Sequence, residues 1–406
     1  MLSFAAAHLD YLHPGHPDYH RAKYALLNKA LHDYRETLSA PITTDNCDAL
    51  LGTANLIQYL MWCDLSFMEG QEPPTPPQTH THTHTNTHSP TRTPSTPSLD
   101  LSGDRLYFLS TGVRQIFFMA WPLFQTPQSV FNNVGLLQPC VALEDVVDAR
   151  GLGWQRHLRG FMDLYDNPRY RGGMRSTTTT SSSCASVSSE TSQSSGSFPA
   201  TPAAGSASGS GSGQAATASG SAAAYFEGLL QSVSASAPFS TGPAYSVMTL
   251  WQSYKEGEAY VRNAGAHDET LMRAAYKRLV ARLAVAMAFV LDREGGEGGA
   301  CPAMTAATAG RRGSGLRQPA LKQEDMVRYV ATFPMMCFGP LLTLISGGDS
   351  RMLVVLLHIY RVTGALLPGE TYWWCRRRVE AMEDAIGREL RSRGLEVCLR
   401  GRNEVA

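Results

Sequence analysis

The sequence lacks closely spaced cysteines. Its 406 residues include eight cysteines, of which Cys47 and Cys63 are the nearest pair, and no CxxC motif occurs. Zinc ribbons and zinc clusters need such pairs, because one metal ion must reach two thiolates from a single turn. The pattern argues against a structural zinc site, and we expect most of these cysteines to be small buried hydrophobes in a reducing compartment.

An excess of charge of one sign is also lacking. Lysine plus arginine equals aspartate plus glutamate at 35 each, so the formal net charge is zero. Proteins that bind the phosphate backbone of nucleic acids carry clusters of basic residues. The balance of positive and negative charges therefore argues against a chain whose main role is nucleic-acid binding. The longest apolar runs, at 283–291 and 352–360, fall short of the ~20 residues that a bilayer requires. We therefore expect no membrane span.

Motifs of common catalytic folds are absent as well. The sequence has no nucleophile elbow, phosphate loop or dinucleotide fingerprint, and the glycine-rich stretch at 295–299 has no Lys-Ser/Thr after it. The aspartate-rich metal motif that an all-α terpene cyclase would need is missing too. The sequence therefore predicts a protein that is not an enzyme, with no catalytic residues, no metal site and no cofactor.

Three long segments cannot join a hydrophobic core. They are rich in threonine, proline and histidine, in serine, threonine, alanine and glycine, and in glycine, alanine and arginine, at 71–98, 176–224 and 294–318. Such compositions bury too little apolar surface to offset the entropy of ordering, so we expect disordered insertions. They separate four blocks and leave a short tail, at 1–70, 99–171, 225–293, 319–395 and 396–406.

Apolar residues recur at steps of three and four in each block, which predicts amphipathic helices. The first stripe consists of Tyr24, Leu27, Leu31, Tyr34 and Leu38. Pro41 should end that helix, and Asp45 should cap the next. In the second block Ser102 precedes a helix that Pro122 should stop, and in the third Asp268 precedes another.

No sustained alternation of period two occurs, so a sheet is not required. Each block alone has too few helices to bury both faces of a layer. We therefore predict one all-α domain over 1–395 that carries the three insertions, since loop-closure entropy grows only with the logarithm of loop length.

The C-terminal block is the most distinctive. Phe333-Pro334 ends one helix, an apolar helix begins after Asp349-Ser350, and Tyr372-Trp373-Trp374 leads into a last helix. That helix is expected to carry the stripe Val379, Met382, Ile386 and Leu390 and to be seated against the preceding apolar helix by the paired tryptophans. This region resembles the C-terminal end of the regulatory domain of fungal zinc-cluster transcription factors, of the sterol-uptake-control type.

Other stretches resemble the same family. The alanine-rich stretch 4–9 is similar to its first helix, the helices at 19–38 and 45–61 to its second and third, and 106–114 to a segment in which glycine precedes a short hydrophobic helix. The resemblance implies an all-α regulatory module in the nucleus, often dimeric, that in some members binds a sterol or another apolar effector. It also implies contact with the transcription machinery and control of RNA polymerase II transcription.

The chain departs from the family in one respect. Family members carry an N-terminal cluster of six closely spaced cysteines, and this chain has none. We expect either a free-standing regulatory domain or one whose zinc-cluster exon lies upstream. The chain as given is not expected to bind DNA specifically, and zinc is expected only if such an exon exists.

Two apolar clusters are candidates for lining an effector pocket. The clusters at 117–121 and 335–338 are apolar on more than one face, which requires burial all round. Methionine adapts to ligands of varied shape. For any single residue, ordinary core packing is the favoured alternative. The candidate residues, together with a tryptophan of the last helix, are Phe117, Phe118, Trp121, Met335, Met336, Phe338 and Trp373.

Histidines and arginines form the remaining groups of interest. The threonine repeat holds His80, His82, His84 and His88, which could chelate a transition metal, although the repeat itself explains them. His16 and His20 are four residues apart, but neighbouring prolines and a glycine favour a turn over a metal site. The arginines at 376–378 alternate with acidic residues at helical spacing, which favours a solvated, ion-paired face.

The sequence thus predicts a transcriptional regulator that responds to an apolar effector without catalysis. Two alternatives stay open. An all-α enzyme acting on an apolar metabolite would need convergent titratable groups in its pocket, and an interaction scaffold would show an exposed apolar patch instead of a pocket.

Overall fold

The computed structural model describes residues 1–68, 99–124, 126–132, 139–171, 268–295 and 321–395. Within these ranges the regular secondary structure is entirely helical, which confirms the all-α prediction. The expected insertions 71–98 and 176–224, the tail 396–406 and much of the third block lie outside the described residues. Two residues assigned to the third insertion, 294 and 295, belong instead to the end of a helix.

Eleven α-helices and three short 3-10 helices occur in the described ranges. The α-helices are α1 (Leu2–Leu12), α2 (Pro17–Ser39), α3 (Cys47–Trp62), α4 (Arg105–Phe124), α5 (Pro139–Ala149), α6 (Gln155–Asp166), α9 (Glu269–Gly295), α10 (Gln323–Met336), α11 (Pro340–Ser346), α12 (Ser350–Leu366) and α13 (Trp373–Ser392). The 3-10 helices are η1 (Ser66–Met68), η2 (Pro168–Tyr170) and η3 (Glu370–Tyr372).

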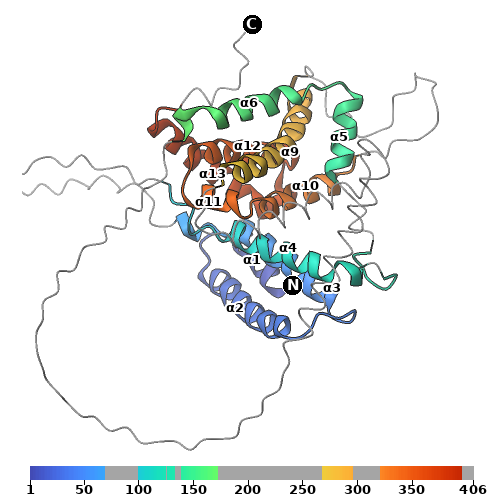
Figure 1. The fold of residues 1–406 in the computed structure, drawn as a ribbon. Coiled ribbons are helices and arrows are strands. Elements are labelled where there is room, and N and C mark those ends of the chain that lie inside the picture. The colour runs from blue at the N-terminus through green and yellow to red at the C-terminus, as the bar shows by residue number, and fades with distance from the viewer. Residues whose placement is uncertain (69–98, 125, 133–138, 172–267, 296–320, 396–406) are drawn as a thin grey trace, which may run out of the picture.

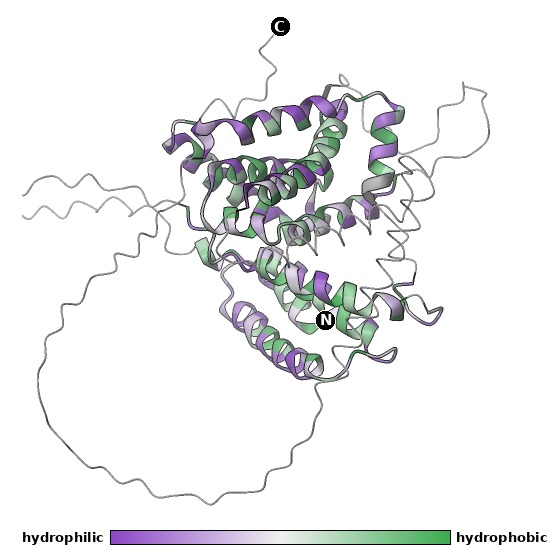
Figure 2. Ribbon diagram, in the orientation of Figure 1, coloured by the Kyte–Doolittle hydropathy of each residue, from purple (hydrophilic) through white to green (hydrophobic). Residues whose placement is uncertain are grey.

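The helices form two layers. Figure 1 shows α1–α4, the first layer, on one side of the molecule, and α5, α6 and α9–α13, the second layer, on the other. The layers meet where α4 packs on α10 and where α3 and α1 pack on α13. The hydropathy colouring of Figure 2 agrees, because α2 and α6 at the periphery are largely hydrophilic on their outer faces.

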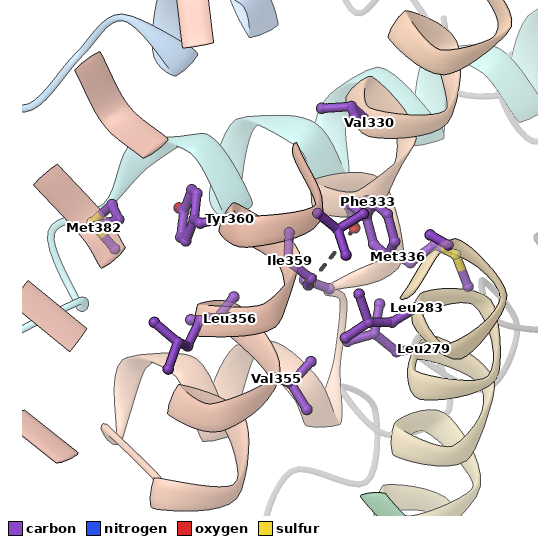
Figure 3. Close-up of a cluster of buried hydrophobic side chains, with 14 of the residues drawn as sticks. Leu279, Leu283, Val330, Phe333, Met336, Val355, Leu356, Ile359, Tyr360 and Met382 are labelled. Atoms are coloured by element: carbon purple, nitrogen blue, oxygen red, sulfur yellow. Dashed lines mark hydrogen bonds between the residues drawn. The ribbon is translucent and has the colours of Figure 1, made fainter. Parts of the chain in front are cut away.

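Helix α12 forms the centre of the second layer. Its side chains from Met352 to Leu357 are all buried, which explains why it is apolar on every face. Figure 3 shows its neighbours: Leu279 and Leu283 of α9 on one side, and Met382 of α13 on the other. The predicted stripe of the last helix is buried on α12, since Val379, Met382, Ile386 and Leu390 all belong to the same core.

Two predicted helix starts are confirmed and two are wrong. Asp268 Oδ1 accepts hydrogen bonds from the amides of Thr270 (2.9 Å) and Leu271 (3.1 Å), and Asp349 caps α12 in the same way. Helix α3, however, starts after Asn46 instead of Asp45. Helix α4 is preceded by Asp104 instead of Ser102. The carboxylate of Asp104 accepts a hydrogen bond from the amide of Leu106 (3.0 Å).

Proline ends only one of the three helices as predicted. Helix α2 stops at Ser39, two residues before Pro41. Pro122 and Pro334 instead lie inside the last turns of α4 and α10. A proline there removes one N–H but leaves the following amides free to reach back, so each helix continues for two more residues. After Gly339, which has a positive φ of 56°, α11 continues at 86° to α10.

The paired tryptophans make their ring contacts with helices of the first layer. Trp374 packs edge-on against Tyr59 (4.8 Å between centroids) and Trp62 (5.7 Å) of α3. Trp373 stacks on His8 of α1 (4.6 Å). The tryptophans therefore join the two layers, because the neighbours of this end of α13 come from the N-terminal helices. Among the described helices, none alone has the length and apolar content to cross a bilayer, although the bent pair α10–α11 passes that test together.

Candidate functional site

Three of the predicted pocket residues meet on the second half of α4. The ring of Phe117 contacts those of Phe118 (5.5 Å) and Trp121 (5.1 Å) and lies 6.3 Å from that of Phe124. Phe118 and Trp121 are buried, whereas Phe117 is partly exposed. The crowding follows from the sequence, since aromatic residues at i, i+1 and i+4 of one helix cover more than one face.

The end of α10 supplies the opposite wall. Met335 and Phe117 both pack against a small core that α3 and α4 form around Leu50, Ala54 and Ala120. Met336 points the other way, toward Leu283 of α9, as Figure 3 shows. Phe338 lies just beyond the end of α10, and the guanidinium of Arg114 lies 4.0 Å from the centre of its ring.

Trp373 belongs to a different place. Its partners are His8, Phe4 (5.1 Å) and Tyr11 (5.7 Å) of α1, at the opposite end of the layer contact. The structure thus gathers Phe117, Phe118, Trp121, Met335 and Phe338 along the contact of α4 with α10, and it separates Met336 and Trp373 from them.

Polar side chains that sequence reasoning missed run along the same contact. Arg114 is fully buried and donates to the carbonyl oxygen of Met335 (3.1 Å). Gln58 of α3 donates to Ser110 Oγ (3.1 Å) and to the carbonyl oxygen of Ala331 (2.7 Å). We call this group, Gln58, Ser110, Arg114, Met335 and Phe338, the α4–α10 seam. The sequence feature that could have predicted this group is an arginine and a glutamine on otherwise apolar helix faces.

A second buried polar group corrects the prediction for the arginines. Arg376 is exposed and pairs with Glu380 (3.1 Å), as expected of a solvated face. Arg378 is instead fully buried, where it bonds to Asp104, to Tyr360 Oη (3.2 Å) and to the carbonyl oxygen of Asp64 (2.8 Å). Burial opposes its charge, but neighbouring Tyr360 and Asp104 hold the pKa of Arg378 above its usual value. It thereby joins α13 to the end of α3 and the start of α4.

An open cleft lies between α1, α2 and α3, with a volume of about 290 Å³. Leu50, Ile57 and Leu60 of α3 form its apolar floor, and Ala30 and Tyr34 line it from α2. We call it the α2–α3 cleft. None of the seven predicted pocket residues lines it. Helix α2 buries little of its length beside this cleft: within that helix only Lys23 and Leu27 are buried.

The histidines near the start have structural partners. His20 lies in α2, not in a turn, and its Nδ1 is 3.6 Å from Asp10. Asp10 also accepts from Lys23 (3.3 Å) in a largely buried pair. His16 stacks on Tyr19 (4.5 Å). Among the side chains that the structure describes, no three His, Cys, Asp or Glu residues gather as metal ligands would, and His80, His82, His84 and His88 lie outside the described ranges.

Comparisons with protein-family models, curated proteins and solved structures find no match for this chain.

Proposed function

We propose that this chain is an effector-sensing regulatory domain of the fungal zinc-cluster type, acting in the nucleus on RNA polymerase II transcription. Its sequence resemblance to the sterol-uptake-control regulators supports this function, and its all-α fold is compatible with it. The domain itself acts without catalysis. It binds a sterol or another apolar molecule, pairs with a second copy and contacts the transcription machinery, while DNA is recognised by an attached or associated module.

The α4–α10 seam is the observation that carries this proposal. It joins the two layers through hydrogen bonds to α10 carbonyl oxygens and through the arginine–ring contact at Phe338. Directional contacts of this kind are either made or broken, and we infer that the effector selects between an arrangement of the layers that has them and one that lacks them. An effector that binds one arrangement more tightly shifts the population toward it, which is what regulation requires.

A reporter assay tests the function. The full chain is fused to a heterologous DNA-binding module in yeast, and reporter output is followed as the sterol supply is restricted. We expect output to change with sterol supply and Arg114→Met to abolish that change. The matched control is Arg105→Met on the exposed face of the same helix. Reporter output equal to that of the DNA-binding module alone under every condition would refute the proposal.

An exposed face of α1 supports a second candidate, an interaction scaffold. Leu2, Leu9 and Leu12 are 72%, 40% and 53% exposed, although they lie in one helix at helical spacing. The side of α1 that faces the protein holds Ser3, Ala6, Ala7 and Asp10 instead. A scaffold would keep its partner contacts when the leucines are intact and lose them in the triple variant Leu2→Ser, Leu9→Ser, Leu12→Ser, whatever the sterol supply.

A further inference from the structure

Helices α2 and α3 leave the α2–α3 cleft open between them. The stripe on α2 begins against the core, where Leu27 is buried, but its later residue Leu38 is 38% exposed. The apolar side chains of α2 therefore pass from burial at Leu27 to partial exposure at Leu38 along the helix that lines the α2–α3 cleft. Buried Leu50, Ile57 and Leu60 line the cleft, so its floor is continuous with both cores of the protein.

Tyr34 lies where the cleft meets these cores. It lines the cleft and packs against both hydrophobic clusters. Its hydroxyl is buried, and within the described part of the chain it makes no hydrogen bond. A buried hydroxyl without a partner lowers stability by about 1–3 kcal/mol, so a ligand that accepts a hydrogen bond from Tyr34 would recover part of that loss. Burial also raises the pKa of Tyr34 to about 12, which keeps the hydroxyl protonated and able to donate.

The rim of the cleft limits the charge of an occupant. Of the described residues that line it, Asp33 has the one charged side chain, and the hydroxyls of Ser3, Thr37 and Thr53 supply further polar groups. Asp33 already pairs with Lys29 (3.3 Å). Met1 also lines the cleft, but no lysine, arginine or histidine of the described ranges does, so an anion would meet the Asp33 carboxylate without a cationic side chain to pair with. A volume of about 290 Å³ lies just below the range of about 300–1,000 Å³ that small-molecule sites occupy.

We propose that the α2–α3 cleft binds a compact uncharged amphiphile, whose apolar body covers Leu50 and Ile57 and whose hydrogen-bond acceptor takes the proton of the Tyr34 hydroxyl after a small turn of that side chain opens the hydroxyl to the cleft. As the effector site of the regulator described above, this assignment rests on that proposed function. Binding and regulation are nevertheless separate measurements. A chain that binds at Tyr34 but leaves the reporter unchanged refutes the regulatory function alone.

The test uses the full chain and prodan, an uncharged naphthalene with a single ketone acceptor. Its fluorescence shifts to the blue when it leaves water, so a titration gives a dissociation constant. We expect saturable binding that Tyr34→Phe weakens by roughly two- to tenfold, the range for one lost hydrogen bond. Ala30→Leu, which fills the cleft from α2, should abolish it. Tyr24→Phe and Ala25→Leu make the same changes elsewhere on α2 and should leave it unchanged.

A second readout separates a ligand-binding tyrosine from a structural one. Without prodan, Tyr34→Phe should raise the melting temperature or leave it unchanged, because the variant removes a buried hydroxyl that has no partner. A structural hydrogen bond would give the opposite sign. An anilinonaphthalene sulfonate, which shares the naphthalene ring but adds a phenylamino group and a negative charge, should bind more weakly than prodan.

Three results would overturn the proposal. One is the absence of saturable prodan binding, and another is binding that survives Ala30→Leu. The third is a Tyr34→Phe variant that binds prodan as tightly as the unchanged chain. Equal affinity for the sulfonate would contradict the selectivity for uncharged ligands.

Discussion

Arg378 is a cation in the middle of an apolar core, and its partners come from three separate parts of the chain. Its guanidinium bonds to Asp104, Tyr360 and two carbonyl oxygens at the end of α3, and the ring of Phe67 lies 5.2 Å from it. A buried ion pair adds little net stability by itself, because both ions lose water. Removal of one partner is different, since it leaves the other charge buried and uncompensated.

We therefore expect Arg378→Met to lower the free energy of unfolding by about 3–5 kcal/mol. Urea unfolding followed by circular dichroism measures it. Arg376→Met is the matched control two residues away on the exposed face, where an ion pair contributes at most about 1 kcal/mol. If both variants lose the same small amount, Arg378 does not hold the helix ends together.

His358 gives the protein a pH dependence that can be assigned to one residue. It lies edge-on to the ring of Phe161 (5.5 Å), between α6 and α12. Burial, with smaller effects of Arg361 and His157, lowers its pKa from 6.5 to about 4. Between these values the unfolded chain binds a proton that the folded chain does not. His358 therefore contributes stability above pH 6.5, and this contribution is lost as the pH falls toward 4.

The comparison of the unchanged chain with His358→Leu isolates this contribution. We expect the unchanged chain to lose more stability than the variant between pH 7 and pH 5, as measured by urea unfolding at each pH. Carboxylates that titrate in the same range contribute equally to both proteins and cancel. Parallel pH profiles would show that His358 is not shielded from water.

At the scale of helices, one glycine lies at a close approach of α12 to α13. A β-carbon at Gly364 would lie 3.2 Å from Val379 Cγ1, closer than most real contacts. At Gly160 in α6 the same atom would have no described neighbour within 4 Å. Glycine inside a helix otherwise lowers stability by roughly 0.5–1 kcal/mol relative to alanine. Glycine at position 364 therefore lowers the stability of α12 itself but allows α12 and α13 to approach closely.

Gly160→Ala should stabilise the protein by about 0.5–1 kcal/mol. The free energy of unfolding of Gly364→Ala should be lower than that of Gly160→Ala by about 1–3 kcal/mol, the range for overpacking a core. Thermal unfolding of both variants measures the difference. The double variant Gly364→Ala, Val379→Ala should recover part of the loss, because the clash is with the valine. Additive effects in this double-mutant cycle would mean that the two residues do not meet.

Local signals predicted the helices well, and non-local contacts account for the errors. Asp268 and Asp349 cap within three residues, so sequence spacing was enough. The role of Arg378 was missed because Asp104 lies far away in sequence, whereas Glu380 and its neighbours suggested local pairing. The contacts of the tryptophans with the first layer were missed for the same reason, since Tyr59 and His8 are distant in sequence.

The candidate site was harder to predict than the helices. Apolar clusters on α4 and α10 do converge, but Met336 faces α9 and Trp373 faces α1, because helical periodicity does not specify which neighbour covers each face. The α2–α3 cleft gave no sequence signal. It lies beside a helix that buries few residues, and the stripe on α2 looked the same as a fully buried one.

At the scale of the whole molecule, the two layers should differ in local stability. Helix α12 is buried along almost its whole length, whereas α2 has two fully buried residues. Segments with few buried contacts open without global unfolding. Native-state hydrogen exchange should therefore show the amides of α2 exchanging first among the long helices and those of α12 exchanging only with global unfolding.

Ligand binding should slow hydrogen exchange in one part of the protein, at α2 and α3. A compound that occupies the α2–α3 cleft contacts α2 and α3 together, so it should slow exchange around Tyr34 and Leu50 more than anywhere in α12. We expect saturating prodan to protect the second half of α2 and the first half of α3, and Ala30→Leu to remove the protection. Equal protection throughout the protein would indicate binding elsewhere. Protection along α4 and α10 would move the effector site to the seam that Arg114 and Phe338 form.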